Sequence, residues 1–169
     1  MDEVTIKKFP DPALRKKAAK VGKITPCEKD LLNEMARIMY LAQGVGLAAS
    51  QVGVSKQLAV IDVGTGLIKL INPVIAKREG SEVLEEGCLS LPGVNVKVKR
   101  ARMVIVNFLD EEGNARRLCA DGLLARALQH EIDHLTGVLI IDYLNPIKKL
   151  LLKRKIGTKV RKRELRKRT

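Results

Sequence analysis

The chain has 169 residues, a formal net charge of +13 and no Trp, with only two Tyr and two Phe. This length suffices for a single domain with its own apolar core, so a disulfide-stapled miniprotein is excluded. No apolar run approaches the length of a membrane span and the first residues lack the apolar segment of a signal peptide, so we expect no membrane partner or anchor. Three cysteines, an odd number without framework spacing, predict a reduced, cytoplasmic protein.

The positive charge is concentrated at the C-terminal end. Residues 148–169 contain twelve Lys or Arg and one acid, Glu164, whereas the remainder of the chain is nearly neutral. We therefore expect one domain over residues 1–147, extended by a basic helical tail over residues 148–169 that starts near Asn145-Pro146. Two interpretations of this tail remain: a solvated, partly frayed helix, or an arm that contacts the phosphates of RNA.

The first forty residues predict a strand, a short helix and a long helix. Asp11 and Pro12 supply an N-cap and a first-turn proline for a helix through about Lys17. Thr25-Pro26-Cys27-Glu28 forms a capping box, and apolar residues recur behind it at helical spacing. We expect this long helix to stop at Gln43-Gly44.

A stretch of small residues follows, Gly44-Val45-Gly46-Leu47-Ala48-Ala49-Ser50-Gln51. Its glycines and alanines leave little to pack with, but they let a ligand approach the backbone closely. The pattern fits a tight turn that feeds a strand, and it fits a ligand-binding edge equally well.

Residues 57–120 are expected to be mostly β. Residues 58–63 and 68–76 flank a Gly-Thr-Gly turn, and residues 103–109 are expected to pair with residues 115–119. Such short connections favour antiparallel sheets over parallel ones. Between these two hairpins, residues 85–93 predict a defined loop around Cys88 and not a regular strand.

The second long helix carries both histidines of the chain. Asp121 is its expected cap and Gly137 its end, and His130 and His134 lie four residues apart. Residues at this spacing share one helix face, so both imidazoles can bind one metal ion. Glu131 completes an H-E-x-x-H pattern, in which the glutamate is the general base. The alternative is a buried helix whose histidines are simply hydrogen-bonded.

A catalytic metal site needs a third protein ligand, and the sequence has no third histidine. The candidates are Cys88, in a glycine-flanked loop, and Cys119, at the end of a strand, which we expect to be a buried structural thiol. Cys88 is the better candidate. One thiolate with two imidazoles suits Zn, Fe(II), Co or Ni and argues against Mg or Ca.

These patterns together predict an α+β fold. Antiparallel β-sheets are expected to pack around a central metal-binding helix, with a capped N-terminal helix and a basic C-terminal helix.

Three stretches, GVGLAASQ at 44–51, EGCLS at 86–90 and QHEIDHLTG at 129–137, together resemble peptide deformylase. The N-terminal segment FPDPALRKKA is similar to that family as well. The resemblance implies a hydrolase that removes the formyl group from the N-terminal formyl-methionine of newly made polypeptides and releases formate. It also implies one divalent metal ion, Fe(II) in the cell, with Zn, Ni or Co as other occupants.

The same resemblance assigns roles to individual residues. It implies that the metal is held by Cys88, His130 and His134. Glu131 would act as the acid/base, and Gln51 together with the backbone N–H of Leu89 would stabilise the oxyanion.

Formyl-methionyl peptides and nascent chains are the expected partners. An open backbone at Gly44, Val45 and Gly46 can add a substrate strand without reading its side chains. By resemblance, the methionine pocket would lie at Val45, Leu123 and Ala127, with His130 at its floor. Many family members carry Arg or Tyr in the loop after Leu91-Pro92, where this chain has Gly93-Val94-Asn95. The family's C-terminal helix is implicated in ribosome docking, so the basic tail is expected to contact the ribosome or its RNA.

Two other classes of function compete with this one. A zinc endopeptidase would use H-E-x-x-H, but it needs a third ligand that the sequence does not offer in the usual place. A basic RNA-binding structural protein would be indifferent to a Glu131→Gln substitution. We also expect Asp133 to be a structural ion-pair residue.

Overall fold

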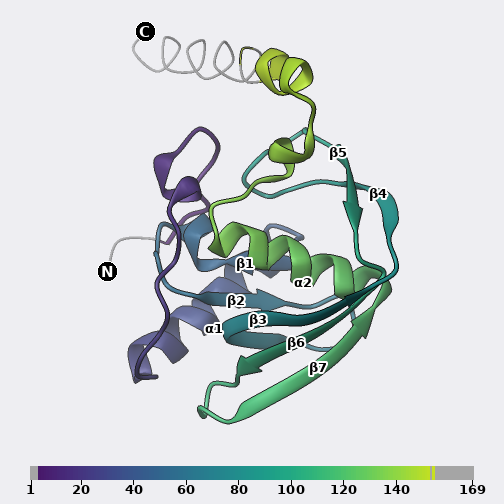
Figure 1. Ribbon diagram of the computed structural model, residues 1–169. Helices are drawn as coiled ribbons and strands as arrows, with labels where there is room; N and C mark the ends of the chain where they lie inside the picture. Colours follow the sequence, from purple (N-terminus) through teal and green to yellow (C-terminus); the bar gives the residue numbers. More distant parts are fainter. Residues whose placement is uncertain (1–3, 153, 155–169) are drawn as a thin grey trace, which may run out of the picture.

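The computed structural model describes residues 4–152 and residue 154, and its core is an antiparallel sheet with one helix on each face (Figure 1). The five strands of this sheet lie in the order β1-β2-β3-β6-β7, and strands β4 and β5 form a second, two-stranded sheet. The strands are β1 (Gly46–Ala48), β2 (Leu58–Ile61), β3 (Ile68–Glu79), β4 (Glu82–Glu86), β5 (Val96–Arg100), β6 (Met103–Leu109) and β7 (Ala115–Asp121). The helices are α1 (Pro26–Leu41) and α2 (Gly122–Leu135), with 3-10 turns at η1 (Pro12–Arg15), η2 (Ala49–Val52) and η3 (Ile140–Tyr143).

Strand β2 shows how the sheet separates two apolar layers. All four of its residues are buried, and successive side chains point to opposite faces of the sheet. Leu58 and Val60 belong to the cluster that includes α1, whereas Ala59 and Ile61 belong to the cluster that includes α2. Helix α2 is therefore held against a buried sheet along much of its length, which fixes where its polar side chains emerge.

The long N-terminal helix begins at the expected capping sequence. The Thr25 N–H donates to the Glu28 carboxylate at 2.9 Å, and Pro26 is the first helical residue. The helix ends at Leu41, and Gln43 has a positive φ of 54° that turns the chain out of the helical path. Because the chain reverses here, β1 starts only five residues after α1 and lies beside β2.

Both predicted hairpins are confirmed. Strand β2 pairs antiparallel with β3, and β6 pairs antiparallel with β7 from Met103 opposite Asp121 to Leu109 opposite Ala115. The β4–β5 hairpin was not predicted, so the expected loop at 85–93 starts in fact after Glu86. The sequence signal for this hairpin was the alternation in β5, where Val96, Val98 and Arg100 are buried and Lys97 and Lys99 are exposed. Its partner β4 is mostly exposed, and an exposed strand shows no such alternation.

Other local predictions were wrong near the N-terminus. None of the described residues 4–10 lies in a strand. The short helix is only the 3-10 turn Pro12–Arg15, with the Asp11 side chain accepting from Ala13 N–H at 2.8 Å. This turn ends before Lys17 because the following residues bond to the end of α2 and not to the turn. The Ala18 N–H donates to the Leu135 carbonyl.

Two side-chain predictions around α2 also need correction. Asp121 occupies the N-cap position, but its side chain makes no capping hydrogen bond. Cys119 is exposed on β7 and is not a buried structural thiol. Strand β7 is an edge of the sheet, and successive side chains of a strand point to opposite faces. Cys119 therefore points to the face that is exposed to solvent.

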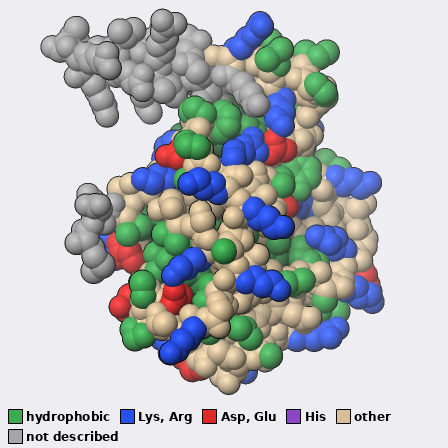
Figure 2. Space-filling model, turned by 60° about the vertical axis from the view of Figure 1, so that its left-hand side comes forward, with side chains coloured by type: hydrophobic (Ala, Val, Ile, Leu, Met, Phe, Trp, Pro, Cys, Tyr) green, Lys and Arg blue, Asp and Glu red, His purple; other side chains and the backbone are tan. Residues whose placement is uncertain are grey.

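The C-terminal helix starts where the sequence predicts. Residues 146–152 are helical, and the Lys148 N–H donates to the Asn145 side chain at 2.8 Å. Most of the predicted tail, residue 153 and residues 155–169, lies outside the described residues. On the face shown in Figure 2, Lys and Arg side chains of the described part are scattered among other side chains and form no single cluster. Within the described ranges, no helix has the length and apolar character needed to cross a membrane.

Candidate metal centre

Helix α2 places both histidines side by side in the interior. The Nε2 atoms of His130 and His134 are 3.2 Å apart, and the ring centroids are separated by 4.9 Å. Burial, followed by the nearby charge of His130, holds the pKa of His134 well below its usual value, so this ring is neutral. A neutral imidazole is the form that binds a metal.

Cys88 joins the histidines from the loop that follows β4. Its Sγ atom is 3.2 Å from His134 Nε2, and the ligand atoms of Cys88, His130 and His134 all lie within 4.8 Å of one another. The ligands of a tetrahedral ion at bond lengths of about 2.0–2.3 Å lie roughly 3.3–3.7 Å apart. The three side chains therefore fit one metal ion. Exposed Cys119, the other candidate ligand, does not belong to this group.

A buried carboxylate that sequence analysis missed holds His130 in place. Glu86 accepts from Arg100 Nε and Nη2 at 2.8 and 2.9 Å and from Arg126 Nη1 at 2.6 Å. Burial raises the pKa of Glu86, but hydrogen bonds from His130 and Arg100 outweigh it and lower the pKa to about 2. An ionised carboxylate can only accept, so the His130 Nδ1, 3.1 Å away, carries the proton. Burial lowers the pKa of His130, but hydrogen bonds with Cys88 and Glu86 outweigh it and raise the pKa to about 10. A metal ion would displace the proton from Nε2 and leave the proton on Nδ1 with Glu86.

The arginine partners of Glu86 continue this network to the surface. Arg100 Nη1 also donates to Asp133 at 2.7 Å, and the Tyr143 hydroxyl donates to the same carboxylate oxygen at 2.7 Å. The structural ion pair expected for Asp133 is thus present. The sequence indicates that Arg100 points inward, because it follows two buried valines at the two-residue spacing of one face of β5. An arginine at an inward position needs a buried acid, and Glu86 supplies it.

Glu131 is buried beside the ligands and points at the glycine-rich stretch. A Cβ atom built on Gly46 would lie 2.3 Å from Glu131 Oε1. Its other carboxylate oxygen has no hydrogen-bond partner in the described part of the chain. Burial raises the pKa of Glu131 to about 7, against the lowering influence of His130 and Arg100. A carboxylate with this pKa can take up and release a proton near neutral pH, and a bound cation would lower the value again.

Of the two predicted oxyanion donors, Gln51 contacts Cys88 and Leu89 follows Cys88 in the chain. Gln51 is buried in η2, with its Oε1 atom accepting from Ala48 N–H at 2.8 Å. This bond turns the amide nitrogen towards Ser90 Oγ at 3.2 Å and Cys88 Sγ at 3.7 Å. Leu89 directly follows Cys88, and within the described residues its backbone N–H has no acceptor. Both groups are therefore near the metal site, and the N–H of Leu89 is available to a ligand.

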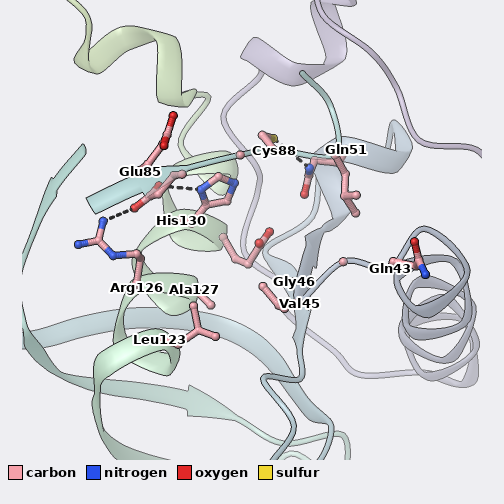
Figure 3. A pocket seen from close by; sticks show the side chains of 15 residues that line it. Gln43, Val45, Gly46, Gln51, Glu85, Cys88, Leu123, Arg126, Ala127 and His130 are labelled. Atoms are coloured by element: carbon pink, nitrogen blue, oxygen red, sulfur yellow. Dashed lines mark hydrogen bonds and ion pairs between the residues drawn. The ribbon is translucent and has the colours of Figure 1, made fainter. Parts of the chain in front are cut away.

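A cavity of about 400 Å³ opens onto this centre. In Figure 3, Gln51, Cys88 and His130 lie at one end, with Val45 and Gly46 on one side and Leu123 and Ala127 on the other. All predicted substrate-binding residues line the cavity: Gly44, Val45, Gly46, Leu123 and Ala127. Sequence analysis did not predict that Gln43, Glu85 and Arg126 also line it. The arrangement joins three side chains that could hold a metal ion, a buried carboxyl group and a partly apolar pocket.

The chain is similar to known proteins over most of its length. A family model described as polypeptide deformylase matches residues 4–150. The peptide deformylase of Caldanaerobacter subterraneus subsp. tengcongensis is 55% identical over 137 residues, which are 81% of this chain and 86% of the relative. That of Thermodesulfovibrio yellowstonii is 50% identical over 159 residues, which are 91% of this chain and 96% of the relative. The crystal structure of a peptide deformylase from Legionella pneumophila matches with a TM-score of 0.88 and 42% identity, covering 95% of this chain and 96% of that one.

Proposed function

The chain belongs to the polypeptide deformylase family, and from this premise we propose that its Cys88, His130 and His134 hold the metal at which a formyl group is removed. The protein is a metal-dependent hydrolase that removes the N-formyl group of newly synthesised polypeptides. The observation that carries the assignment of the site is the convergence of one thiolate and two imidazoles next to a buried glutamate.

A metal ion held by Cys88, His130 and His134 would polarise the formyl carbonyl as a Lewis acid and would acidify the attacking water. Glu131 accepts the proton from that water and returns it to the nitrogen of the departing amine. Its single unpartnered oxygen and its raised pKa support this assignment, since a carboxylate tied up in ion pairs could not shuttle a proton. Proton transfer by such a group contributes about 10²–10⁴-fold to the rate.

Gln51 and Leu89 are proposed to stabilise the negative charge that develops on the formyl oxygen. The Gln51 amide is oriented by Ala48, and the Leu89 N–H is free among the described residues. Donors that are oriented before the reaction need no reorganisation when charge develops, and one such donor is worth about 3 kcal/mol.

The substrate is proposed to lie along β1. This strand is an edge of the five-stranded sheet, so its free side can pair with an extended peptide. Val45 and Leu123 are 44% and 56% exposed at the mouth of the cavity, where an apolar methionine side chain would cover them. Main-chain pairing gives affinity without sequence preference, which suits an enzyme that acts on many nascent chains.

We further propose Fe(II) as the native metal, with Zn, Ni or Co as possible occupants. Thiolate and imidazole ligands accept all four ions, whereas Mg and Ca prefer oxygen ligands. A thiolate at an iron site is open to oxidation, so activity should decay in air with Fe(II) and persist with Ni. A cytoplasmic location is proposed because newly made chains are the substrate, and the basic tail is proposed to dock the enzyme on ribosomal RNA.

The test is formate release from a formyl-Met tripeptide, with protein purified without oxygen and loaded with Fe(II) or Ni. Glu131→Gln is expected to lower kcat by at least about 10²-fold at unchanged metal content. Glu34→Gln, on the outer surface of α1, is the matched control and should leave kcat unchanged. Absence of formate at full metal occupancy would reject the proposal, and cleavage of internal peptide bonds would favour an endopeptidase.

A further inference from the structure

The segment Lys7-Lys8-Phe9 joins the two loops that carry the proposed oxyanion donors. The Lys7 N–H donates to the Gln51 carbonyl at 2.7 Å, and the Phe9 N–H donates to the Ser90 carbonyl at 2.9 Å. Gln51 and Ser90 come from distant parts of the sequence, one from η2 and the other from the loop after β4. The distance between the two donors is therefore set partly by this N-terminal segment.

Lys8, which lies between Lys7 and Phe9 in the chain, makes a third hydrogen bond, to the loop after β4. Its ammonium group donates to the Leu89 carbonyl at 2.6 Å. Lys8 is exposed, whereas the backbone it contacts belongs to the half-buried residue next to Cys88. The side chain thus reaches from the surface to the peptide that follows the proposed donor.

The side chain of Leu89 is confined as well. A Cβ atom built on Gly44 would lie 2.6 Å from Leu89 Cδ1, so this side chain lies directly against the glycine-rich stretch. Because the four bonds at a Cα atom have fixed angles, holding the side chain and the carbonyl group fixes the position of the Leu89 nitrogen. The Leu91 N–H donates to the Cys88 carbonyl at 2.9 Å, and the planar peptide bond between Cys88 and Leu89 then sets the direction of the Leu89 N–H. Lys8 fixes the carbonyl and Gly44 accommodates the side chain.

The segment itself is anchored. Phe9 packs on the cluster that contains Leu91, Val96 and Ile140, and the Arg15 guanidinium lies 5.9 Å from the Phe9 ring centroid. A donor on an anchored segment can hold a loop in one orientation, whereas a donor on a free terminus would move with it.

We propose that Lys8 is a positioning residue that aims the Leu89 N–H at the formyl oxygen. The proposal rests on the proposed function, because it gives Leu89 the role of oxyanion donor. A misaimed donor weakens binding of the transition state and leaves binding of the ground state unchanged, so its loss should appear in kcat and not in KM.

The experiment compares Lys8→Met, which keeps the aliphatic stem but cannot donate, with Lys8→Arg, which can. Lys17→Met is the matched control: it is an exposed lysine further along the N-terminal part of the chain, after η1 and outside the site. Nickel-loaded wild type and variants are compared in formate release, metal content and melting temperature. Exchange of the Leu89 amide proton is followed by NMR as a readout that is independent of turnover.

Lys8→Met is expected to lower kcat about tenfold, less than the 10²–10³-fold loss of a whole donor, with KM, metal content and melting temperature unchanged. The Leu89 amide should exchange faster, Lys8→Arg should restore most of kcat, and Lys17→Met should match wild type. Wild-type kcat in Lys8→Met, or a loss explained by lost metal or a lowered melting temperature, would overturn the proposal. Inactive nickel-loaded wild type would instead remove the proposed function, and the Leu89 amide would still report whether Lys8 orders this loop.

Discussion

Two glycines explain how the proposed acid/base, Glu131, and the proposed oxyanion donor, Leu89, come close to the glycine-rich stretch. Gly46 lies against the Glu131 carboxylate and Gly44 against the Leu89 side chain. Any larger residue at either position would occupy space that the site residues fill. The glycine-rich stretch is therefore needed for close approach of side chains from α2 and from the Cys88 loop, in addition to the substrate access that the sequence suggested.

Gly46→Ala is expected to lower kcat by about 10–100-fold, because the new methyl group would lie 2.3 Å from Glu131 Oε1 and displace that carboxylate. The fold should persist, since alanine is accepted in a strand and no positive φ is required at this position. Steady-state kinetics and a thermal melt on the metal-loaded enzyme measure the two effects separately.

Gly22→Ala is the matched control, since nothing lies within 4 Å of a Cβ atom there. It should leave kcat at the wild-type value. Wild-type turnover in Gly46→Ala would show that Glu131 does not depend on this close contact.

At the scale of elements, α1 supports the strand at which the substrate is proposed to bind. Leu47 of β1 belongs to the same apolar cluster as Leu32, Met35 and Met39 of the helix. The start of α1 is in turn fixed by Glu28, which bonds to Thr25 and to the Lys56 ammonium group. The ion pair between Glu28 and Lys56 thus connects the first turn of α1 to the segment before β2. We expect this connection to help keep the edge strand β1 in register with β2.

This ion pair predicts a dependence of stability on pH. Hydrogen bonds from Lys56, and then from Thr25, lower the pKa of Glu28 from 4.5 to about 2. A carboxyl group whose pKa is lowered by folding stabilises the fold above its unfolded pKa, and that contribution is lost as the pH falls towards the folded value. Glu28→Gln should therefore reduce the free energy of unfolding by about 1 kcal/mol at pH 6, a modest value because Lys56 is half-exposed.

The difference between Glu28→Gln and wild type should shrink between about pH 5 and pH 2, measured by urea denaturation. Loss of metal in acid affects both proteins, so the difference between them isolates Glu28. Glu112→Gln is the control. It removes an exposed acid of the β6–β7 hairpin loop that lies 3.9 Å from Lys29, and the difference between this variant and wild type should not change with pH in this way. A difference that stays constant down to pH 2 would contradict the role of the charge.

At the scale of the whole molecule, the charge is divided between a nearly neutral body and a basic tail. We propose residues 1–147 as the catalytic domain and residues 148–169 as its extension. The start of that extension is fixed to the body, because both Lys149 and Arg15 pair with Asp142. The first turns of the C-terminal helix therefore have a defined place, and Lys and Arg on the body face of Figure 2 form no competing basic cluster.

Truncation after Leu152 keeps the Lys149–Asp142 pair and removes most of the tail's basic residues. It should lower co-sedimentation with ribosomes at low salt, because fewer phosphate counterions are released on binding. Turnover of short formyl peptides should be unchanged, since the described residues that line the cavity all fall between positions 43 and 131. Equal co-sedimentation of the full and truncated chains at low salt would contradict docking through the tail.

The elements and the candidate ligands that depend on neighbours along the chain could be predicted from the sequence alone. His130, Glu131 and His134 belong to one helix, so their common face follows from helical geometry alone. The capping box at Thr25 and the two hairpins likewise depend on short-range bonds, and the structure contains each of them. Cys88 was predicted as the better of two cysteine candidates for the third ligand, and family resemblance added Gln51 and Leu89. Periodicity alone could not bring these three residues together.

Only the tertiary structure decided which distant residues support these groups. Glu86 is buried against Arg100 and Arg126, residues from two other elements, and no local pattern pairs them. The N-terminal segment shows the same limit. Its sequence predicted a strand, but its N–H groups donate to the carbonyl groups of Gln51 and Ser90 in two other loops. Local sequence sets the conformation of a short segment, whereas the partners of its polar groups are set by what the whole chain places beside it.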